Sequence, residues 1–302
     1  MRRIEADEEP IAFIEWKEQD YEKGLIERSS IKYERSKQTD YQGKPVSSDI
    51  VWRILPTSTV EAADRESKIH YYSKDELRKK LLEKQGHLCC YCGQRIFDNH
   101  HTRIEHIFPK SKDIRVTFKY FNLAAACQGG HYEYHIVEQG DSLASILRKY
   151  KTTEETLRFL NPRTDFDNIE LKAKMRIEVS DNHCDVKKKD NVINLMPNIC
   201  KFEEILFYEI NGKIYCEDQI FQNELDNILN LNYPTLKLKR ENKYKSFEGF
   251  YETIFELDAE TQKKVIDIAI KQVKSKSMDT DGHLKFQEMF FVEEFFLNTL
   301  LP

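Results

Sequence analysis

Four cysteines, widely separated along the chain, place the strongest constraint on its fold. Cys89 and Cys92 enclose two residues and are followed by Gly93, whereas Cys127 precedes a glycine pair and Cys184 precedes a run of lysines. A Cys-x-x-Cys turn lets two thiolates converge on one ion, and two further thiolates complete a closed tetrahedral zinc site. We therefore predict a structural Zn²⁺ bound by these four cysteines.

Other interpretations of the same residues remain open. Cys127 and Cys184 can be plain buried thiols, and His131 or His183 can replace one thiolate as a ligand. Cys90, inside the turn, is expected to point away from the ion. The total of seven cysteines is odd, which fits metal ligands and spare thiols in a reducing compartment better than a disulfide framework.

Length and composition limit the function further. A chain of 302 residues is long enough for about two domains, and 33% charged residues with only 10 Gly and 8 Pro favour a helix-rich, well-solvated surface. The net charge of -5 argues that any binding of nucleic acid is local. Residues 1–10 have no apolar run behind their arginines, and no later segment reaches the length of a membrane span, so we expect a cytoplasmic protein.

Between the cysteines lies the segment TRIEHIFPKS, residues 102–111. Glu105 and His106 stand at the end of a short β-type run, where they can offer a metal ligand and a general base side by side. A strand histidine alone is more often structural. The pattern gains weight because Asn122 precedes Cys127 and Asp185 follows Cys184, which adds an amide and a second carboxylate near the same cysteines.

Cations accompany this segment. Across residues 87–131, six lysines and arginines outnumber three acidic residues, so the local charge favours a polyanion. The candidates for contact with phosphates are Lys110, Lys112, Arg115 and Lys188. Each is equally compatible with an ordinary surface cation.

A segment of different character, residues 132–180, separates Cys127 from Cys184. Its apolar spacing and turn residues predict a β-α-α-β unit, with helix starts after Asp141 and at Thr153. Two terminal strands that pair antiparallel bring the ends of the unit together, so such a unit can be inserted without breaking the host fold.

The overall prediction is an α+β protein with α-rich N- and C-terminal regions. The phenylalanines near the C-terminus are interpreted as core residues rather than a partner-binding stripe. The predicted regions are an N-terminal region (1–72), a discontinuous core (73–131 plus 181–200), an insert (132–180) and a C-terminal region (201–302).

The order Cys-x-x-Cys, IEHIFPKS, FNL, Cys and CDVKK resembles the HNH endonucleases of the ββα-metal class. The N-terminus and residues 229–242 add a resemblance to the PtuB-type HNH nucleases of Septu and retron-associated defence systems. The resemblance implies that His106 is the general base, Glu105 the first metal ligand and Asn122 the residue that orients the base. Asp185 falls where a His or Asn usually binds the metal; a carboxylate there suits Mg²⁺.

The implied function is hydrolysis of nucleic-acid phosphodiesters, DNA in preference to RNA, in a bacterial antiphage defence system. Mg²⁺ is the expected catalytic ion, with Mn²⁺ as an alternative, and a PtuA-like ATPase of the SMC or ABC type is the expected partner.

The insert resembles a LysM domain over its whole length. That family binds glycans containing N-acetylglucosamine, and the matching loop residues are Gly140, Asp141, Ser142, Leu143, Asn161 and Pro162. Two ligands remain open, a glycan or nucleotide sugar and a protein. An alternative function is therefore a LysM-based adaptor with a non-catalytic zinc scaffold. In a nuclease, the insert could regulate the site by moving Asp185 relative to His106.

Overall fold

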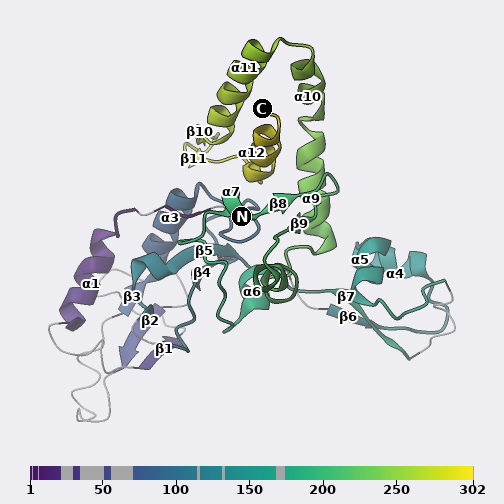
Figure 1. The fold of residues 1–302 in the computed structure, drawn as a ribbon. Coiled ribbons are helices and arrows are strands. Elements are labelled where there is room, and N and C mark those ends of the chain that lie inside the picture. The colour runs from purple at the N-terminus through teal and green to yellow at the C-terminus, as the bar shows by residue number, and fades with distance from the viewer. Residues whose placement is uncertain are drawn as a thin grey trace.

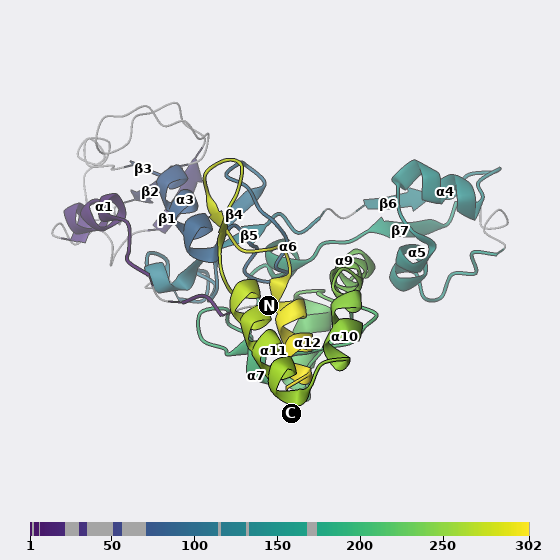
Figure 2. The same ribbon diagram turned by 90° about the horizontal axis from the view of Figure 1, so that it is seen from above.

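The computed structural model describes residues 1, 3–5, 7–21, 30–34, 51–55, 71–113, 116–130, 133–167 and 174–301. These residues form short helices and small antiparallel sheets, which confirms the mixed α+β class. The insert projects from one side of a central core, and the N-terminal helix and strands lie on the opposite side (Figures 1 and 2).

The N-terminal region contains more strand than predicted. Helix α1 (Ile11–Tyr21) is followed by β1 (Ser30–Glu34), β2 (Val51–Leu55) and β3 (Tyr71–Ser73), which form an antiparallel sheet in the order β1-β2-β3. The prediction of an α-rich N-terminal region is therefore wrong for the described residues. Valine, tryptophan and isoleucine dominate β2, and such side chains favour a pleated surface once distant strands are available as partners.

The central core combines α3 (Lys74–Gln85), β4 (Thr102–His106), the 3₁₀ helix η3 (Tyr120–Asn122), β5 (Leu123–Cys127) and α6 (Cys184–Lys188). Helix α3 buries Leu77, Leu81 and Leu82 on one face and ends at Gly86, which has φ +59°. A Cβ at Gly86 would lie 2.1 Å from the ring of Phe286, so this position requires glycine.

The insert folds as predicted. Strand β6 (Glu133–Ile136) pairs antiparallel with β7 (Arg176–Ser180), and α4 (Leu143–Tyr150) and α5 (Glu154–Leu160) lie between them in sequence. The buried side chains form a hydrophobic cluster of their own: Val137, Ile146, Leu157, Phe166, Ile177 and Val179.

Helices dominate the C-terminal region, as expected. They are α7 (Phe202–Ile205), α8 (Gln219–Asn223), the π-helical turn η5 (Glu224–Ile228), α9 (Pro234–Lys245), α10 (Glu248–Phe255), α11 (Ala259–Val273) and α12 (Phe290–Thr299). Two short hairpins interrupt these helices: β8 (Phe207–Tyr208) pairs with β9 (Ile214–Tyr215), and β10 (Ser277–Met278) pairs with β11 (Leu284–Lys285). Phe290 and Phe291 are core residues, as expected.

Candidate functional site

The four predicted cysteine ligands converge. Their sulfur atoms all lie within 4.8 Å of one another, and Cys92 Sγ is 3.8 Å from Cys127 Sγ. A tetrahedral ion with Zn–S bonds of about 2.3 Å requires S···S distances of about 3.8 Å. Although burial opposes it, hydrogen bonds with neighbouring thiols hold the pKa of Cys89 well below its usual value. The four cysteines are therefore compatible with a zinc site.

The alternative ligands are placed less favourably. His183 Nδ1 lies 3.1 Å from Cys184 Sγ and 3.9 Å from Cys127 Sγ, so the imidazole contacts the cysteine cluster from outside. Cys90 is not one of the converging cysteines, and burial raises its pKa well above the usual value. His131 lies outside the described residues.

Gln85 fastens the Cys-x-x-Cys turn to β5. Its amide nitrogen donates to Leu88 O and Ala125 O, both at 2.8 Å, and its amide oxygen accepts from Ala125 N at 2.7 Å. The side chain is buried, so three hydrogen bonds form away from water. As a result, the cysteine turn is held against the strand that ends at Cys127.

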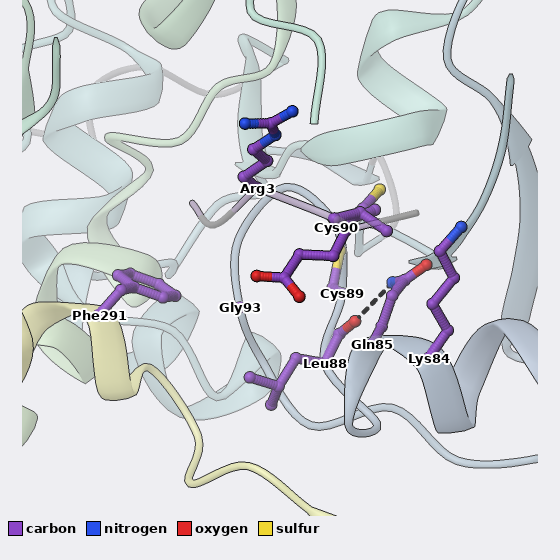
Figure 3. A pocket seen from close by; sticks show the side chains of 10 residues that line it. Arg3, Lys84, Gln85, Leu88, Cys89, Cys90, Gly93 and Phe291 are labelled. Carbon is purple, nitrogen blue, oxygen red and sulfur yellow. Dashed lines mark hydrogen bonds between the residues drawn. The ribbon is translucent and has the colours of Figure 1, made fainter. Parts of the chain in front are cut away.

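A pocket lies beside the cysteine turn (Figure 3). It is lined by Arg3, Ile4, Glu5, Lys84, Gln85, Leu88, Cys89, Cys90, Gly93 and Phe291. None of the predicted catalytic residues lines it. The candidate catalytic groups lie instead on the β4–β5 hairpin and α6.

Strand β4, the 3₁₀ helix η3 and helix α6 carry those groups. In the antiparallel pair β4–β5, Glu105 stands opposite Ala124 and His106 opposite Leu123. Helix α6 follows the insert and carries Asp185. Glu105 and Asp185 interact through a hydrogen bond that raises the pKa of Glu105. The fold thus joins two carboxylates that the insert separates in sequence.

Glu105 is buried and has several polar partners. Its Oε1 accepts a hydrogen bond from Tyr91 Oη at 2.8 Å and lies 2.7 Å from Lys188 Nζ. Burial raises the pKa of Glu105 well above its usual range, Asp185 adds to this rise, and Lys188 opposes it. On the other side, Asp185 Oδ2 lies 3.7 Å from Arg103 Nε.

His106 is also buried. Its Nε2 lies 3.1 Å from Thr117 O, which in a neutral imidazole makes Nε2 the donor and Nδ1 the basic nitrogen. Burial lowers the pKa of His106 to about 4. The ring is therefore neutral near pH 7 and able to accept a proton, but a pKa this low makes it a weak base.

Asn122 acts on His106 through the intervening loop. Its amide oxygen accepts from Phe108 N at 2.8 Å, and its amide nitrogen donates to Phe108 O at 3.0 Å and Val116 O at 3.2 Å. These bonds hold the loop that presents Thr117 O to His106. The predicted role of orienting the base is thus compatible with an indirect contact.

The predicted phosphate-binding cations differ in position. Lys112 is exposed, and Lys110 is partly buried, which lowers its pKa to about 8. Arg115 lies outside the described residues. Lys188 is fully buried, and its ammonium also donates to His106 O at 3.2 Å. This placement differs from the surface contact predicted for Lys188, because α6 packs its side chain against Glu105.

Sequence reasoning missed Tyr91 and Arg103. Arg103 precedes Glu105 by two residues, and the period of a strand places both on one face, so this signal was available. Tyr91 lies between two cysteines of the turn, but its contact with Glu105 depends on how the turn packs on β4.

The family comparison identifies the insert. The family model described as LysM domain matches residues 135–180, which contain the β-α-α-β unit with its own hydrophobic cluster. Residues 135–180 are a LysM domain. Comparison of the whole chain with curated proteins gave no match.

Several predicted ligand-binding side chains of the LysM domain form internal hydrogen bonds. Asp141 Oδ2 accepts from His135 Nε2 at 2.8 Å and Glu138 N at 2.7 Å. Ser142 caps α4 through a capping box with Ser145. Asn161 donates to Leu157 O and Glu178 O and accepts from Glu178 N. These three residues therefore have a sufficient structural role.

The other three predicted ligand-binding residues of the LysM domain are Gly140, Leu143 and Pro162. Gly140 has φ +96° and nothing within 4 Å of an added Cβ, so its surroundings are open. Leu143 packs on the edge of the domain's hydrophobic cluster. Pro162 is exposed and follows Asn161 after α5. Gly140, Leu143 and Pro162 can therefore offer backbone and apolar surface to a ligand.

The LysM domain is joined to the core at its two ends. His183 N donates to Gly129 O at 2.7 Å, so the segments before and after the domain lie side by side. A Cβ at Gly129 would lie 1.9 Å from His183 O, so position 129 requires glycine. Just before α6, Asp181 Oδ2 lies 2.5 Å from Lys187 Nζ. The exit of the domain is therefore tied directly to the helix that carries Asp185.

Helix α5 also contacts α9. The rings of Phe159 and Tyr233 are 6.2 Å apart, and Glu155 Oε1 lies 3.2 Å from Lys237 Nζ. Figures 1 and 2 both show α5 on the side of the domain that faces α9. In the described part of the chain, no helix has the length and apolarity to span a membrane.

Proposed function

We propose that this chain is a metal-dependent phosphodiester hydrolase of the HNH type, with DNA preferred to RNA as substrate. The main support is the contact of Asp185, on α6, with Glu105, which precedes His106 on β4. Two carboxylates and a neutral histidine, next to four converging cysteines, match the groups that the sequence resemblance implies. Burying the Glu105 carboxyl group is costly for stability, which also favours a functional role.

The chemistry follows from the residues. His106 Nδ1 would accept a proton from the water that attacks phosphorus, while Thr117 O holds Nε2. Glu105 and Asp185 offer oxygen atoms that suit Mg²⁺, and bound Mg²⁺ would stabilise negative charge on the phosphate. Arg103, whose side chain is 49% exposed, can pair with a substrate phosphate.

Labelled double-stranded DNA, single-stranded DNA and RNA, each with Mg²⁺ or Mn²⁺, test the activity. His106→Ala should lower the cleavage rate at least about 100-fold, because it removes the general base. Zinc content and circular dichroism should stay unchanged. His101→Ala, an exposed histidine outside the site, serves as the matched control. Undiminished Mg²⁺-dependent cleavage by His106→Ala would refute the mechanism.

The LysM match supports a second candidate, a glycan- or protein-binding adaptor whose zinc-compatible core is only a scaffold. Because Gly129 and His183 are hydrogen-bonded, a short linker can replace residues 132–180. A nuclease should keep basal cleavage after this deletion, whereas an adaptor would have no activity left. Titration with N-acetylglucosamine oligomers, followed by melting temperature, tests a glycan ligand of the intact chain.

The proposed setting is cytoplasmic antiphage defence with a PtuA-like SMC or ABC ATPase as partner, and it rests on the sequence resemblance. Co-purification with the ATPase and a change in cleavage rate on its addition are the expected results. An ATPase that neither binds the chain nor alters cleavage would contradict this setting while leaving the nuclease chemistry intact.

A further inference from the structure

One oxygen of Glu105 has two buried donors. Tyr91 Oη lies 2.8 Å and Lys188 Nζ 2.7 Å from Oε1, and both donor side chains are fully buried. Such donors cannot reorient freely, since neither can exchange its partner for water. The orientation of the Glu105 carboxylate is therefore fixed by residues that were not expected to act on it.

Both donors come from cysteine-bearing segments. Tyr91 stands inside the Cys89–Cys92 turn, and Lys188 lies at the end of α6, which begins with Cys184. When the cysteines converge, the turn and α6 approach Glu105 from two directions. The cysteine cluster thus sets the position of both donors.

The two donors differ in their effect on a cation. The Tyr91 hydroxyl is neutral and directs the carboxylate without opposing a positive ion. The Lys188 ammonium compensates the charge of the Glu105–Asp185 pair but repels any divalent cation that binds there. We propose that Tyr91 and Lys188 tune the affinity of the Glu105–Asp185 pair for a divalent cation in opposite directions. This inference rests on the proposed nuclease, since it concerns the same metal site.

Mn²⁺ binding to the zinc-loaded full-length protein tests the proposal without cleavage. Isothermal titration calorimetry and the electron paramagnetic resonance signal of free Mn²⁺ measure the affinity. Tyr91→Phe should bind Mn²⁺ about tenfold more weakly, as is usual when an outer partner of a metal ligand is lost. Lys188→Met should bind about tenfold more tightly. Its melting temperature should fall without Mn²⁺ and recover with it.

Controls separate the possible failures. Tyr251→Phe removes a buried hydroxyl with no hydrogen-bond partner in the described structure, and it should leave the affinity unchanged. Tyr91→Phe is the decisive arm if Lys188→Met does not fold. Wild-type affinity in Tyr91→Phe, or shifts of both variants in one direction, would overturn the inference while leaving the nuclease proposal intact. No saturable Mn²⁺ binding by the wild type, or unchanged binding by Glu105→Gln, would overturn both.

Discussion

The core and the LysM domain use their buried polar groups differently. In the LysM domain, Asp141 and Asn161 bind backbone groups and a neighbouring histidine, and each bond serves to hold a turn or a helix end. In the core, Glu105 and Asp185 face each other, with Lys188 against Glu105. The first arrangement stabilises the fold, whereas the second places two carboxyl groups in contact, one of them against a buried ammonium group.

This difference separates a structural explanation from a functional one. Turn formation accounts fully for Asp141 and Asn161, so their presence is weak evidence for a ligand. No comparable structural need accounts for two interacting carboxylates beside a neutral histidine. Groups with strongly shifted pKa values are typical of active sites, and burial shifts the pKa of both Glu105 and His106 strongly, as it also does for His87 outside the site.

The largest effect is expected at the four converging cysteines, which are compatible with a zinc site. Cys184→Ser should abolish zinc binding and the cooperative unfolding of the core, because structural zinc contributes on the order of 10 kcal/mol. The LysM domain has its own hydrophobic cluster and should stay folded. Zinc analysis and amide NMR spectra check both parts. If the zinc-free variant had the melting temperature of the wild type, the core would not depend on zinc, and the two regions would not differ in this respect.

A smaller effect is expected from pH. The pKa of His106 is about 4 in the fold, against about 6.5 in an unfolded chain, so protons bind the unfolded state more tightly. The free energy of unfolding therefore has its full value above pH 6.5. Titration of His106 lowers it, by up to about 3 kcal/mol, as the pH falls toward 4. Urea unfolding of wild type and His106→Gln between these pH values measures it. If the free energy of unfolding depended on pH equally in the two proteins, His106 would not be the cause of that dependence.

The smallest effect is expected within the LysM domain. Asn161→Ala removes three hydrogen bonds and should destabilise that domain by about 1–3 kcal/mol. Hydrogen exchange in β7 should rise while that of β4 stays constant. If Asn161→Ala abolishes glycan binding without altering exchange, its role is in recognition and the structural explanation fails.

Local sequence signals predicted much of this molecule. The spacing of cysteines and glycines predicted the convergence of Cys89 with Cys184, and apolar periodicity predicted every element of the LysM domain. The end of β4 at His106 was also predicted. These features depend on residues close together along the chain or, for the metal site, on cysteine, a residue type with distinctive chemistry.

Features that depend on distant packing were missed. The burial of Lys188 follows from how α6 packs on β5, which its position in a lysine run does not reveal. The strands β1, β2 and β3 pair across long sequence separations, and such pairing is weakly encoded in any one segment. The hydrogen bond from Tyr91 to Glu105 likewise depends on packing, because it joins the cysteine turn to β4.

The central claim is that His106 and Asp185 belong to one catalytic site despite the intervening LysM domain. The most direct test is the single-turnover rate of DNA cleavage for His106→Ala, Asp185→Asn and the double variant, all loaded with zinc. We predict that the double variant is about as slow as the slower single variant, because residues acting as a unit are not additive. Losses that multiply, or a wild-type rate in Asp185→Asn, would contradict the claim.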